Sequence, residues 1–336
     1  MKDMSMWMAS LGNHLRLCDI TMPGSHDAGI YFGDAVPTGV SRPSLTLSIC
    51  QAGSIYEQCM WGSRFFDVRL KAASGQVKAY HQTAGQGAVG GSAEHILADV
   101  DAFLSSRGSE FVILRITKTK ETDTDILNTI SNSKLGRRLY RNTGGNIALA
   151  TIGELRGKAI CVFESQKFKI LQPSLGFHPF AKWKGGRSAI MGLQTCGAYS
   201  NKSAIREVFA KQLKRTHEHL DHPRDHLFVL YWTQTGGNIF EHTTKELNDA
   251  KANHLHRAAG GAHHNMDYML SLLTDPMDVG RHGERWEVQP TTWADRREQM
   301  PNVVMYDFVN ERNSEQIVML NQRNLTGMLV EKRRRA

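Results

Sequence analysis

Short apolar runs recur along the 336-residue chain, separated by polar or glycine-rich turns and by helical stretches. Runs that are apolar almost throughout are typical of strands buried on both faces of a parallel sheet, since a strand with one wet face alternates apolar and polar residues. Eight segments have this β-rich character: 15–22, 63–70, 76–81, 110–117, 158–164, 188–195, 226–233 and 302–309. Eight strands with helical spacers predict an α/β fold, a single TIM-type (β/α)8 barrel.

Two of the spacers have the period of an amphipathic helix. In 92–110, Ser92 is placed to cap a helix that Gly108 ends. One face of that helix carries Ile96, Val100, Phe103 and Leu104. The segment 203–220 repeats the pattern, with an apolar face that carries Ile205, Val208, Phe209 and Leu213.

The chain shows no low-complexity linker and no internal repeat. We expect one catalytic barrel over 15–312, a lead-in over 1–14, and a C-terminal helix and basic tail over 313–336. The stretch 236–300, rich in Gly, His and Asn, is a long excursion before the last strand. No apolar run approaches the roughly 20 residues that cross a bilayer, and the first twenty residues lack the apolar core of a secretory signal. The chain is therefore expected to be cytoplasmic, or exported without a Sec signal.

Cysteines and histidines are the side chains of this chain that most often bind transition metals. The five cysteines are scattered and form no CxxC pair, so reduced, buried thiols are expected. In "THEHLDHPRDH" (216–226), His219, His222 and His226 suggest a metal, but Pro223 interrupts the helix that would align them. Solvated histidines are the favoured interpretation, for this segment and for 254–265, and no metal or cofactor is expected.

Polar side chains gather where the predicted strands end. The stretch "DITMPGSHDAGIYFGD" (19–34) places His26 and Asp27 directly after a Pro-Gly turn. In the second run, period-two alternation puts Asp67 and Arg69 on one face, while the other face is apolar. Each pair alone is consistent with a solvated turn or a structural salt bridge. In a (β/α)8 barrel, however, active groups collect at the carboxyl ends of the strands.

Two more polar residues fall at strand ends. His81 follows the last apolar residue of the third run, and Asp307 lies in "VVMYDFVN", in the eighth. Because the eighth strand of a closed barrel neighbours the first, Asp307 is expected to reach His26. Two histidines, an arginine and carboxylates are what phosphodiester cleavage requires without a metal. Histidine suits both proton transfers, since its ordinary pKa lies near neutrality.

The motifs "MPGSHDAG", "SRFFDVRL", "YHQT" and "VVMYDFVN" together resemble the X-domain of the phosphatidylinositol-specific phospholipases C, in its bacterial single-domain form. The resemblance spans roughly residues 15–310 and implies a distorted TIM barrel. It also implies cleavage of the lipid headgroup bond through attack by the inositol 2-hydroxyl. The products would be diacylglycerol and inositol 1,2-cyclic phosphate.

The resemblance also implies roles for the polar residues. His26 would be the general base, oriented by Asp307, and Arg69 would bind the phosphate. His81 would be the general acid, with Asp27 as its partner.

Further positions follow from the same resemblance. Asp67 would assist the acid or hold Arg69, Tyr199 would support the inositol ring, and Lys118 would approach the headgroup. Calcium-dependent relatives carry Asn after the first His and Glu-x-Asp on the second strand, so Arg69 occupies a metal-ligand position here and disfavours a dication. The family commonly has an acidic residue where this chain has Thr195 or Cys196.

The inositol contacts are therefore poorly matched, and two alternatives stay open. One is an enzyme acting on a different phosphodiester, and the other is a catalytically dead barrel that binds phosphoinositides. The net charge of +8 and the basic end "EKRRRA" suit phosphate-bearing partners. We expect a transient phospholipid partner at a membrane surface and no nucleic acid, and the sequence leaves the oligomeric state open.

Overall fold

The structure is a computed structural model. It describes residues 3–38, 48–73, 75–83, 86–118, 123–142, 144–164, 167–183, 191–202, 205–219, 224–233 and 300–321. Nearly all of the expected excursion at 236–300 lies outside these residues, as do His222, the segment 254–265 and the end of the chain beyond residue 321. The domain boundaries given above stay a prediction.

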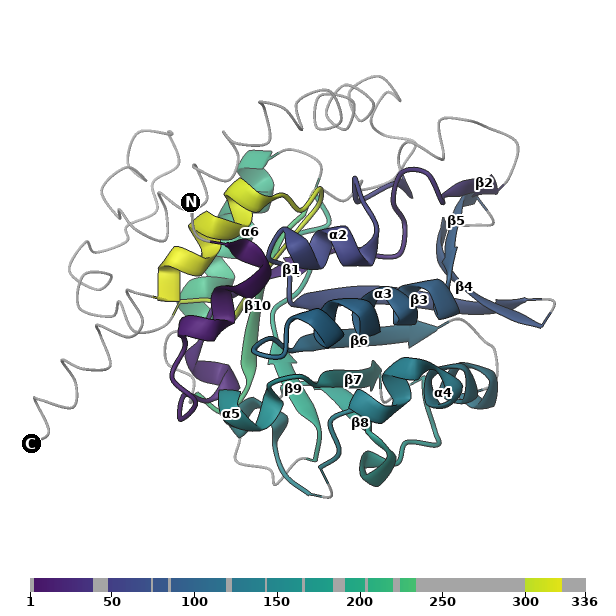
Figure 1. Cartoon of the computed structure of the whole chain (residues 1–336). Coiled ribbons are helices and arrows are strands. Elements are labelled where there is room, and N and C mark those ends of the chain that lie inside the picture. The colour runs from purple at the N-terminus through teal and green to yellow at the C-terminus, as the bar shows by residue number, and fades with distance from the viewer. Residues whose placement is uncertain are drawn as a thin grey trace, which may run out of the picture.

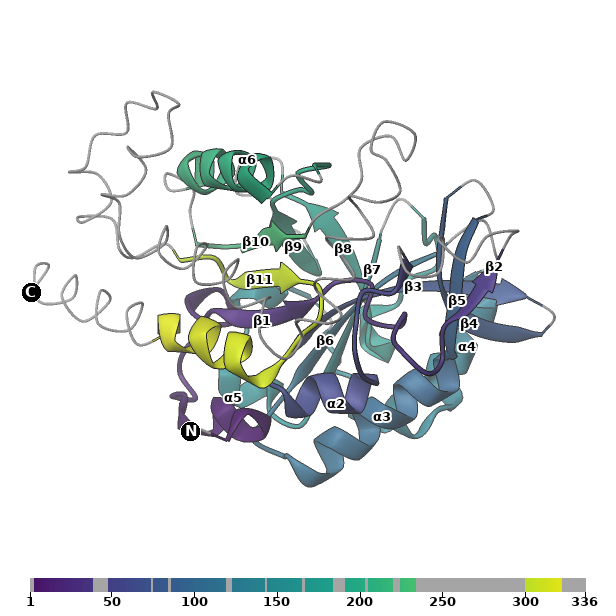
Figure 2. The same cartoon turned by 90° about the horizontal axis from the view of Figure 1, so that it is seen from above.

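Eight parallel strands close into a barrel (Figures 1 and 2). In order around the barrel they are β1 (Met22–Ser25), β11 (Val303–Tyr306), β10 (Leu227–Trp232), β9 (Leu193–Cys196), β8 (Phe177–Lys182), β7 (Ala159–Glu164), β6 (Val112–Lys118) and β3 (Phe65–Ala73). The barrel closes where β1 pairs with β3, with Gly24 beside Phe65. The predicted TIM-type barrel is confirmed.

One of the eight predicted strands is not part of the barrel. The segment 76–81 belongs to β4 (Gln76–Thr83), which pairs antiparallel with β3. Beside the barrel the sheet continues with β5 (Gln86–Ser92), which pairs with β4, and with β2 (Val36–Thr38), which pairs with β5 (Figure 1). The two residues between β3 and β4 allow a hairpin but are far too few for a parallel crossover. The missing barrel strand is β8, whose sequence FHPFAK contains His and Pro and so lacks the signal of a buried strand.

The first predicted strand is displaced toward the carboxyl end. Residues Leu17–Asp19 form a 3-10 helix, and β1 begins only at Met22, so it contains the Pro-Gly pair that resembles a turn. A Cβ on Gly24 would lie 2.7 Å from Cγ1 of Val303. Glycine is therefore required by the close packing of β1 against β11, and not by a turn.

Helices cover the outside of the barrel. Within the described residues the α-helices are α2 (Ile55–Met60), α3 (Ala93–Ser106), α4 (Asp123–Asn132), α5 (Ile152–Leu155), α6 (Ile205–His219) and a helix over 311–321. The other 3-10 helices are Met4–Ser10, Lys134–Arg138, Ile147–Leu149 and Pro173–Leu175. In Figure 2, α6 lies on the opposite side of the barrel from α2 and α3. None of the helices in the described part of the chain is long and apolar enough to cross a membrane.

The two predicted amphipathic helices are α3 and α6. Ser92 caps α3 as expected, because its hydroxyl accepts a hydrogen bond from the backbone N–H of His95 at 3.1 Å. The predicted apolar face of α3 is buried. One apolar cluster lies between α3 and the strands, a second fills the barrel interior, and a third lies beneath α6.

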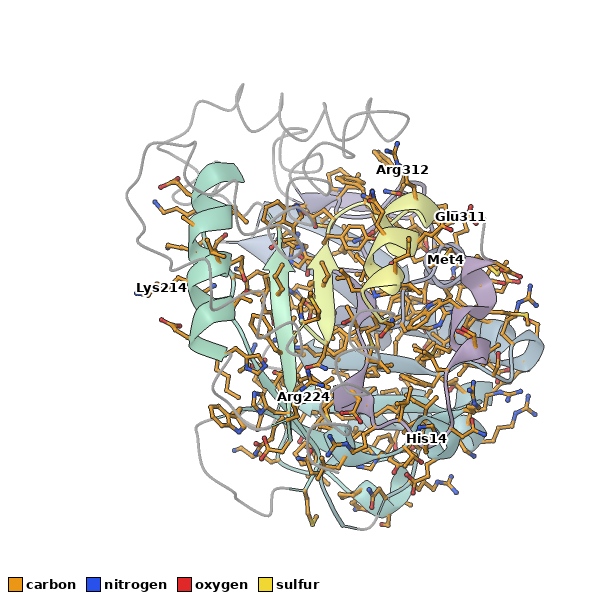
Figure 3. All side chains as sticks on the ribbon, turned by 90° about the vertical axis from the view of Figure 1, so that its left-hand side faces the viewer. Met4, His14, Lys214, Arg224, Glu311 and Arg312 are labelled. Atoms are coloured by element: carbon orange, nitrogen blue, oxygen red, sulfur yellow. The ribbon has the colours of Figure 1, made fainter. Side chains whose placement is uncertain are left out.

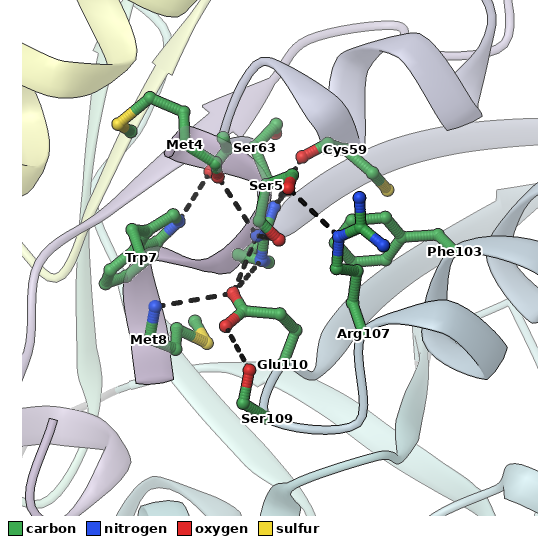
Figure 4. A network of polar contacts seen from close by, with 12 residues as sticks. Met4, Ser5, Trp7, Met8, Cys59, Ser63, Phe103, Arg107, Ser109 and Glu110 are labelled. Carbon is green, nitrogen blue, oxygen red and sulfur yellow. Dashed lines mark hydrogen bonds and ion pairs between the residues drawn. The ribbon is translucent and has the colours of Figure 1, made fainter. Parts of the chain in front are cut away.

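A buried ion pair joins the segments at the amino-terminal end of the barrel (Figure 4). Arg64, just before β3, lies 2.6 Å from a carboxylate oxygen of Glu110, just before β6, and both side chains are fully buried. The guanidinium also donates to backbone carbonyls of Met4, Ser5, Cys59 and Ser63. All its donor groups are therefore satisfied, so the pair ties the N-terminal 3-10 helix to two barrel strands.

Candidate active site

The carboxyl ends of β1 and β11 bring a histidine and a carboxylate together. Ser25 pairs with Tyr306 in the parallel ladder, so the next residue of each strand, His26 and Asp307, lie side by side. Nδ1 of His26 is 2.7 Å from Oδ1 of Asp307, across 281 residues of sequence. The side chain of Gln51 supports this corner by donating to the backbone carbonyls of His26 and Tyr306. The expected contact between Asp307 and His26 is thus present.

Asp27 lies at the centre of the cluster. Its side chain is fully buried, and Oδ1 is 2.7 Å from Nε of Arg69. Oδ2 is 3.2 Å from Nδ1 of His81 and 3.3 Å from Nε2 of His26. One carboxylate therefore contacts both histidines and the arginine.

The backbone is strained on both sides of this cluster. Asp27 has a φ of 42° and Phe308 a φ of 56°, in the left-handed region that side-chain-bearing residues rarely adopt. The backbone N–H of Ala28 donates to the carbonyl of Asp67 at 2.8 Å, and that of Phe308 donates to the carbonyl of Cys50 at 2.8 Å. These bonds hold both turns in place, which is a pattern found where a functional side chain must be aimed.

Asp67 anchors the far side of the cluster. It accepts hydrogen bonds from the Tyr199 hydroxyl and from Nη1 of Arg115, each at 3.0 Å, and lies 4.0 Å from Nη2 of Arg69. The ring of Tyr199 lies against His26, with centroids 5.4 Å apart. Burial, followed by the charge of Asp67, raises the pKa of the Tyr199 hydroxyl well above its ordinary value, so it stays a donor.

Burial and charge act in opposite directions on the two histidines. Burial alone lowers the pKa of His26, but the carboxylates of Asp27 and Asp307 outweigh it and hold that pKa well above the ordinary value. For His81 burial again lowers the pKa, and Asp27 outweighs it, so the pKa is raised. The two groups are not equally accessible, since the His26 side chain is 4% exposed and that of His81 is 24% exposed. Together with Arg69, His81 forms the accessible edge of the site.

The structure also places the remaining candidates. Lys118 was expected near the headgroup, but its ammonium lies 2.7 Å from Oδ1 of Asp123 and 5.0 Å from the ring of Phe168. It points to the outer face of β6, whereas Arg115 points inward, where it contacts Asp67. Arg115 was not singled out in the sequence because it lies inside an apolar run. Its signal is the alternation of β6, which puts residue 115 on the same face as 113 and 117.

One group of potential metal ligands lies within this cluster. His26, Asp27 and Cys50 each offer a ligand atom, and these atoms lie within 4.8 Å of one another. The guanidinium of Arg69, however, already neutralises Asp27 at 2.7 Å and carries a permanent positive charge. A fixed cation in that position opposes a second, divalent one.

Two histidines outside the cluster correct the sequence interpretation. His219 and His226 were expected to be solvated, yet they are only 8% and 1% exposed. They lie together, with Nδ1 of His219 3.3 Å from Nε2 of His226, because α6 ends before Pro223 and the chain then turns back into β10. The five cysteines are free, four of them buried and Cys196 partly so.

Comparison with known proteins agrees with this architecture. No family model matches the chain. It is 26% identical over 172 residues to the 1-phosphatidylinositol phosphodiesterase of Listeria monocytogenes, covering 49% of this chain and 50% of that protein. It is also 26% identical over 164 residues to the protein of the same name from Staphylococcus aureus strain Newman, covering 46% and 49%. The chain thus spans about half the length of the curated relatives it matches.

The structural likeness extends over nearly the whole chain, so the fold is that of the phosphatidylinositol-specific phospholipase C barrels. The solved phospholipase C from L. monocytogenes superposes with a TM-score of 0.60 at 16% identity, covering 95% of this chain and 98% of that one. A mutant of the S. aureus protein gives 0.60 at 17% identity, covering 94% and 97%. The resemblance noted in the sequence, to the bacterial form of these proteins, is confirmed.

Proposed function

We propose that this chain cleaves phosphatidylinositol-type lipids by general acid and base catalysis without a metal, giving diacylglycerol and an inositol cyclic phosphate. The observation that carries the proposal is the contact of one buried carboxylate, Asp27, with two histidines and an arginine. A site that only binds a phosphate needs the arginine, but it needs no pair of imidazoles with supporting carboxylates. The names of the relatives, 1-phosphatidylinositol phosphodiesterase, point to the same substrate.

Each group has a position that suits one step. Nδ1 of His26 is held by Asp307, so Nε2 is the nitrogen that takes the proton from the attacking inositol hydroxyl. Arg69 is fixed through Nε by Asp27, which leaves its terminal nitrogens to donate to the nonbridging phosphate oxygens. His81 protonates the leaving glycerol oxygen, and its raised pKa keeps it in the acid form.

The headgroup contacts favour a second candidate substrate class, another phosphodiester. On β9, where relatives commonly offer an acidic residue, Thr195 is buried and Cys196 packs with the outer cluster beneath α6. Arg115 and Asp67 instead supply the polar groups on that side of the site. The roles of Tyr199 and Lys118 in binding the headgroup stay predictions.

Incubation with vesicles that contain phosphatidylinositol tests this proposal, with the water-soluble products followed by ³¹P NMR. We expect a cyclic phosphodiester signal with the wild-type chain and none with His26→Ala. Parallel incubations use phosphatidylcholine vesicles and a soluble glycerophosphodiester. Turnover of one of these and not of phosphatidylinositol would establish the second candidate. Vesicle binding without turnover of any substrate would show a barrel that binds and does not cleave.

We also propose that the contact with lipid is transient and peripheral. A solved structure of the S. aureus relative concerns modulation of its membrane binding. Co-sedimentation with vesicles, with and without phosphatidylinositol, measures this contact directly. Equal recovery in the supernatant at all lipid concentrations would contradict it.

A further inference from the structure

Three metal-ligating side chains converge on the outer side of the barrel, away from the face that carries the candidate active site. Cys196 ends β9, His219 ends α6, and His226 directly precedes β10. Figure 3 views the molecule from this side and shows α6 standing beside β10, with Arg224 near the start of that strand. Sγ of Cys196 is 3.2 Å from Nδ1 of His219, which is 3.3 Å from Nε2 of His226. All three ligand atoms lie within 4.8 Å of one another.

Two of these separations are close to the edges of a zinc coordination tetrahedron. With Zn–N distances of about 2.0–2.1 Å and Zn–S distances of about 2.3 Å, tetrahedral angles place two ligand nitrogens about 3.3 Å apart and a sulfur about 3.5 Å from a nitrogen. The measured 3.3 Å and 3.2 Å lie within a few tenths of an ångström of those values. The third pair, Sγ of Cys196 and Nε2 of His226, lies within 4.8 Å, so it must close by at most about 1.3 Å to reach the edge of about 3.5 Å.

The orientation of the two histidine rings suits a metal ion. Asp225 lies 2.8 Å from Nδ1 of His226, so that nitrogen donates its proton and Nε2 is left with a lone pair. Nδ1 of His219 faces both this lone pair and the sulfur of Cys196. A ring nitrogen has either one proton or one lone pair, and so it makes one good hydrogen bond of the two. A metal ion uses the lone pairs of all three groups.

The surroundings fix the ligands in orientation. A carboxylate on the far nitrogen of a ligating histidine is the usual support of a metal site, and Asp225 has that position. The ring of Trp183 stacks on His226, with centroids 4.5 Å apart, and the ring of Phe228 stacks on His219 at the same distance. Both histidine side chains are more than nine-tenths buried. The two histidines are therefore buried side chains whose orientation is fixed by their neighbours.

We propose that Cys196, His219 and His226 bind a divalent transition metal ion of the zinc type, which fastens the end of α6 to β9 and β10. Water or another ligand completes the fourth position. The site is structural and distinct from the phosphodiester site, because Cys196 packs with the cluster beneath α6 whereas Tyr199, three residues on, contacts Asp67 inside the barrel. Binding displaces the thiol proton to solvent as the sulfur–metal bond forms.

Metal titration of the full chain tests this inference after removal of bound metal with a chelator. Zn²⁺ titration by calorimetry is expected to show one tight site per chain, with a higher thermal midpoint in the zinc-loaded form. Co²⁺ in place of Zn²⁺ is expected to give the near-ultraviolet charge-transfer absorption of a thiolate ligand and the visible bands of tetrahedral cobalt. Cys196→Ser should abolish the charge-transfer band, and His226→Gln should weaken binding severely.

Two further variants make the test decisive. Asp225→Asn keeps all three ligands and should weaken binding by about 10–100-fold. His95→Gln, an exposed histidine outside the cluster, is the matched control and should bind as the wild type does. Stoichiometric binding that lacks the thiolate band and survives Cys196→Ser would place the metal elsewhere in the chain and overturn the inference. So would a wild-type chain that binds no Zn²⁺ at micromolar concentration.

Discussion

Replacing Asp307 by asparagine removes a negative charge from His26 while preserving the size of the side chain and one hydrogen-bonding oxygen. In the wild type, Nδ1 of His26 lies 2.7 Å from Oδ1 of Asp307, and this carboxylate favours the imidazolium. The variant should therefore lower the pKa of His26. Asparagine can also present its NH₂ group to the ring, so it no longer enforces the tautomer in which Nε2 is the base.

The strength of the interaction follows from the geometry. Two unit charges whose centres are about 4 Å apart interact by about 4 kcal/mol at an effective dielectric constant near 20. Asp307 is 15% exposed, so water screens part of this. Asp27, at 3.3 Å from Nε2, still supports the imidazolium. We therefore expect the pKa of His26 to fall in the variant while staying supported by Asp27.

The pH profile of kcat/KM reports this shift. The general base must be deprotonated, so one limb of the profile follows the pKa of His26, which the two carboxylates hold above the ordinary histidine value in the wild type. In Asp307→Asn this limb should move to lower pH, while the limb that follows His81 stays in place. At the optimum, turnover should fall by about 10–10³-fold, which is less than for His26→Ala.

Glu311→Gln is the matched control, because Glu311 is an exposed carboxylate four residues further on. It should leave both limbs unchanged. A profile in which neither limb moves in Asp307→Asn, or in which a limb moves to higher pH, would refute the assignment of His26 as the base supported by Asp307. A loss equal to that of His26→Ala, with the fold intact by circular dichroism, would show that Asp307 acts in the reaction itself.

Four other outcomes are expected. His81→Ala should lower turnover by about 10²–10⁴-fold with the fold intact, and substantial remaining activity would exclude this residue as the acid. Arg69→Lys should lower kcat by about 10²-fold or more despite the retained charge, since an ammonium lacks the planar fork; near-normal kcat would contradict a bidentate phosphate contact. Activity at assay temperature should survive excess EDTA and gain little from calcium, and full loss restored by calcium would show a metal-dependent reaction. Glu110→Gln should lower the free energy of unfolding by about 3–5 kcal/mol in a urea titration, because it leaves the buried Arg64 without its counter-charge; a change below 1 kcal/mol would mean that the backbone carbonyls suffice.

Much of the candidate site could be predicted because its residues belong to short local patterns. The alternation of β3 placed Asp67 and Arg69 on one face, and the order of the strands made β11 a neighbour of β1, which brought Asp307 to His26. His81 was predicted to end a barrel strand, and this part of the prediction is wrong. It lies on β4, which pairs antiparallel with β3 and is not a barrel strand. His81 still lies beside the other groups because β4 starts from the carboxyl end of β3.

The sequence by itself determined the local properties of the chain: which segments are apolar enough to form strands, where α3 begins, and which polar residues follow strand ends. Apart from the expected contact of Asp307 with His26, only the tertiary structure decided which of these residues meet. Arg115 contacts Asp67 because β3 and β6 pair in one register, and Cys196 meets His219 and His226 because the start of β10 lies beside the end of β9. Register between distant strands depends on the closure and stagger of the whole barrel. No window of the sequence carries that information, so contacts between strands had to come from the fold.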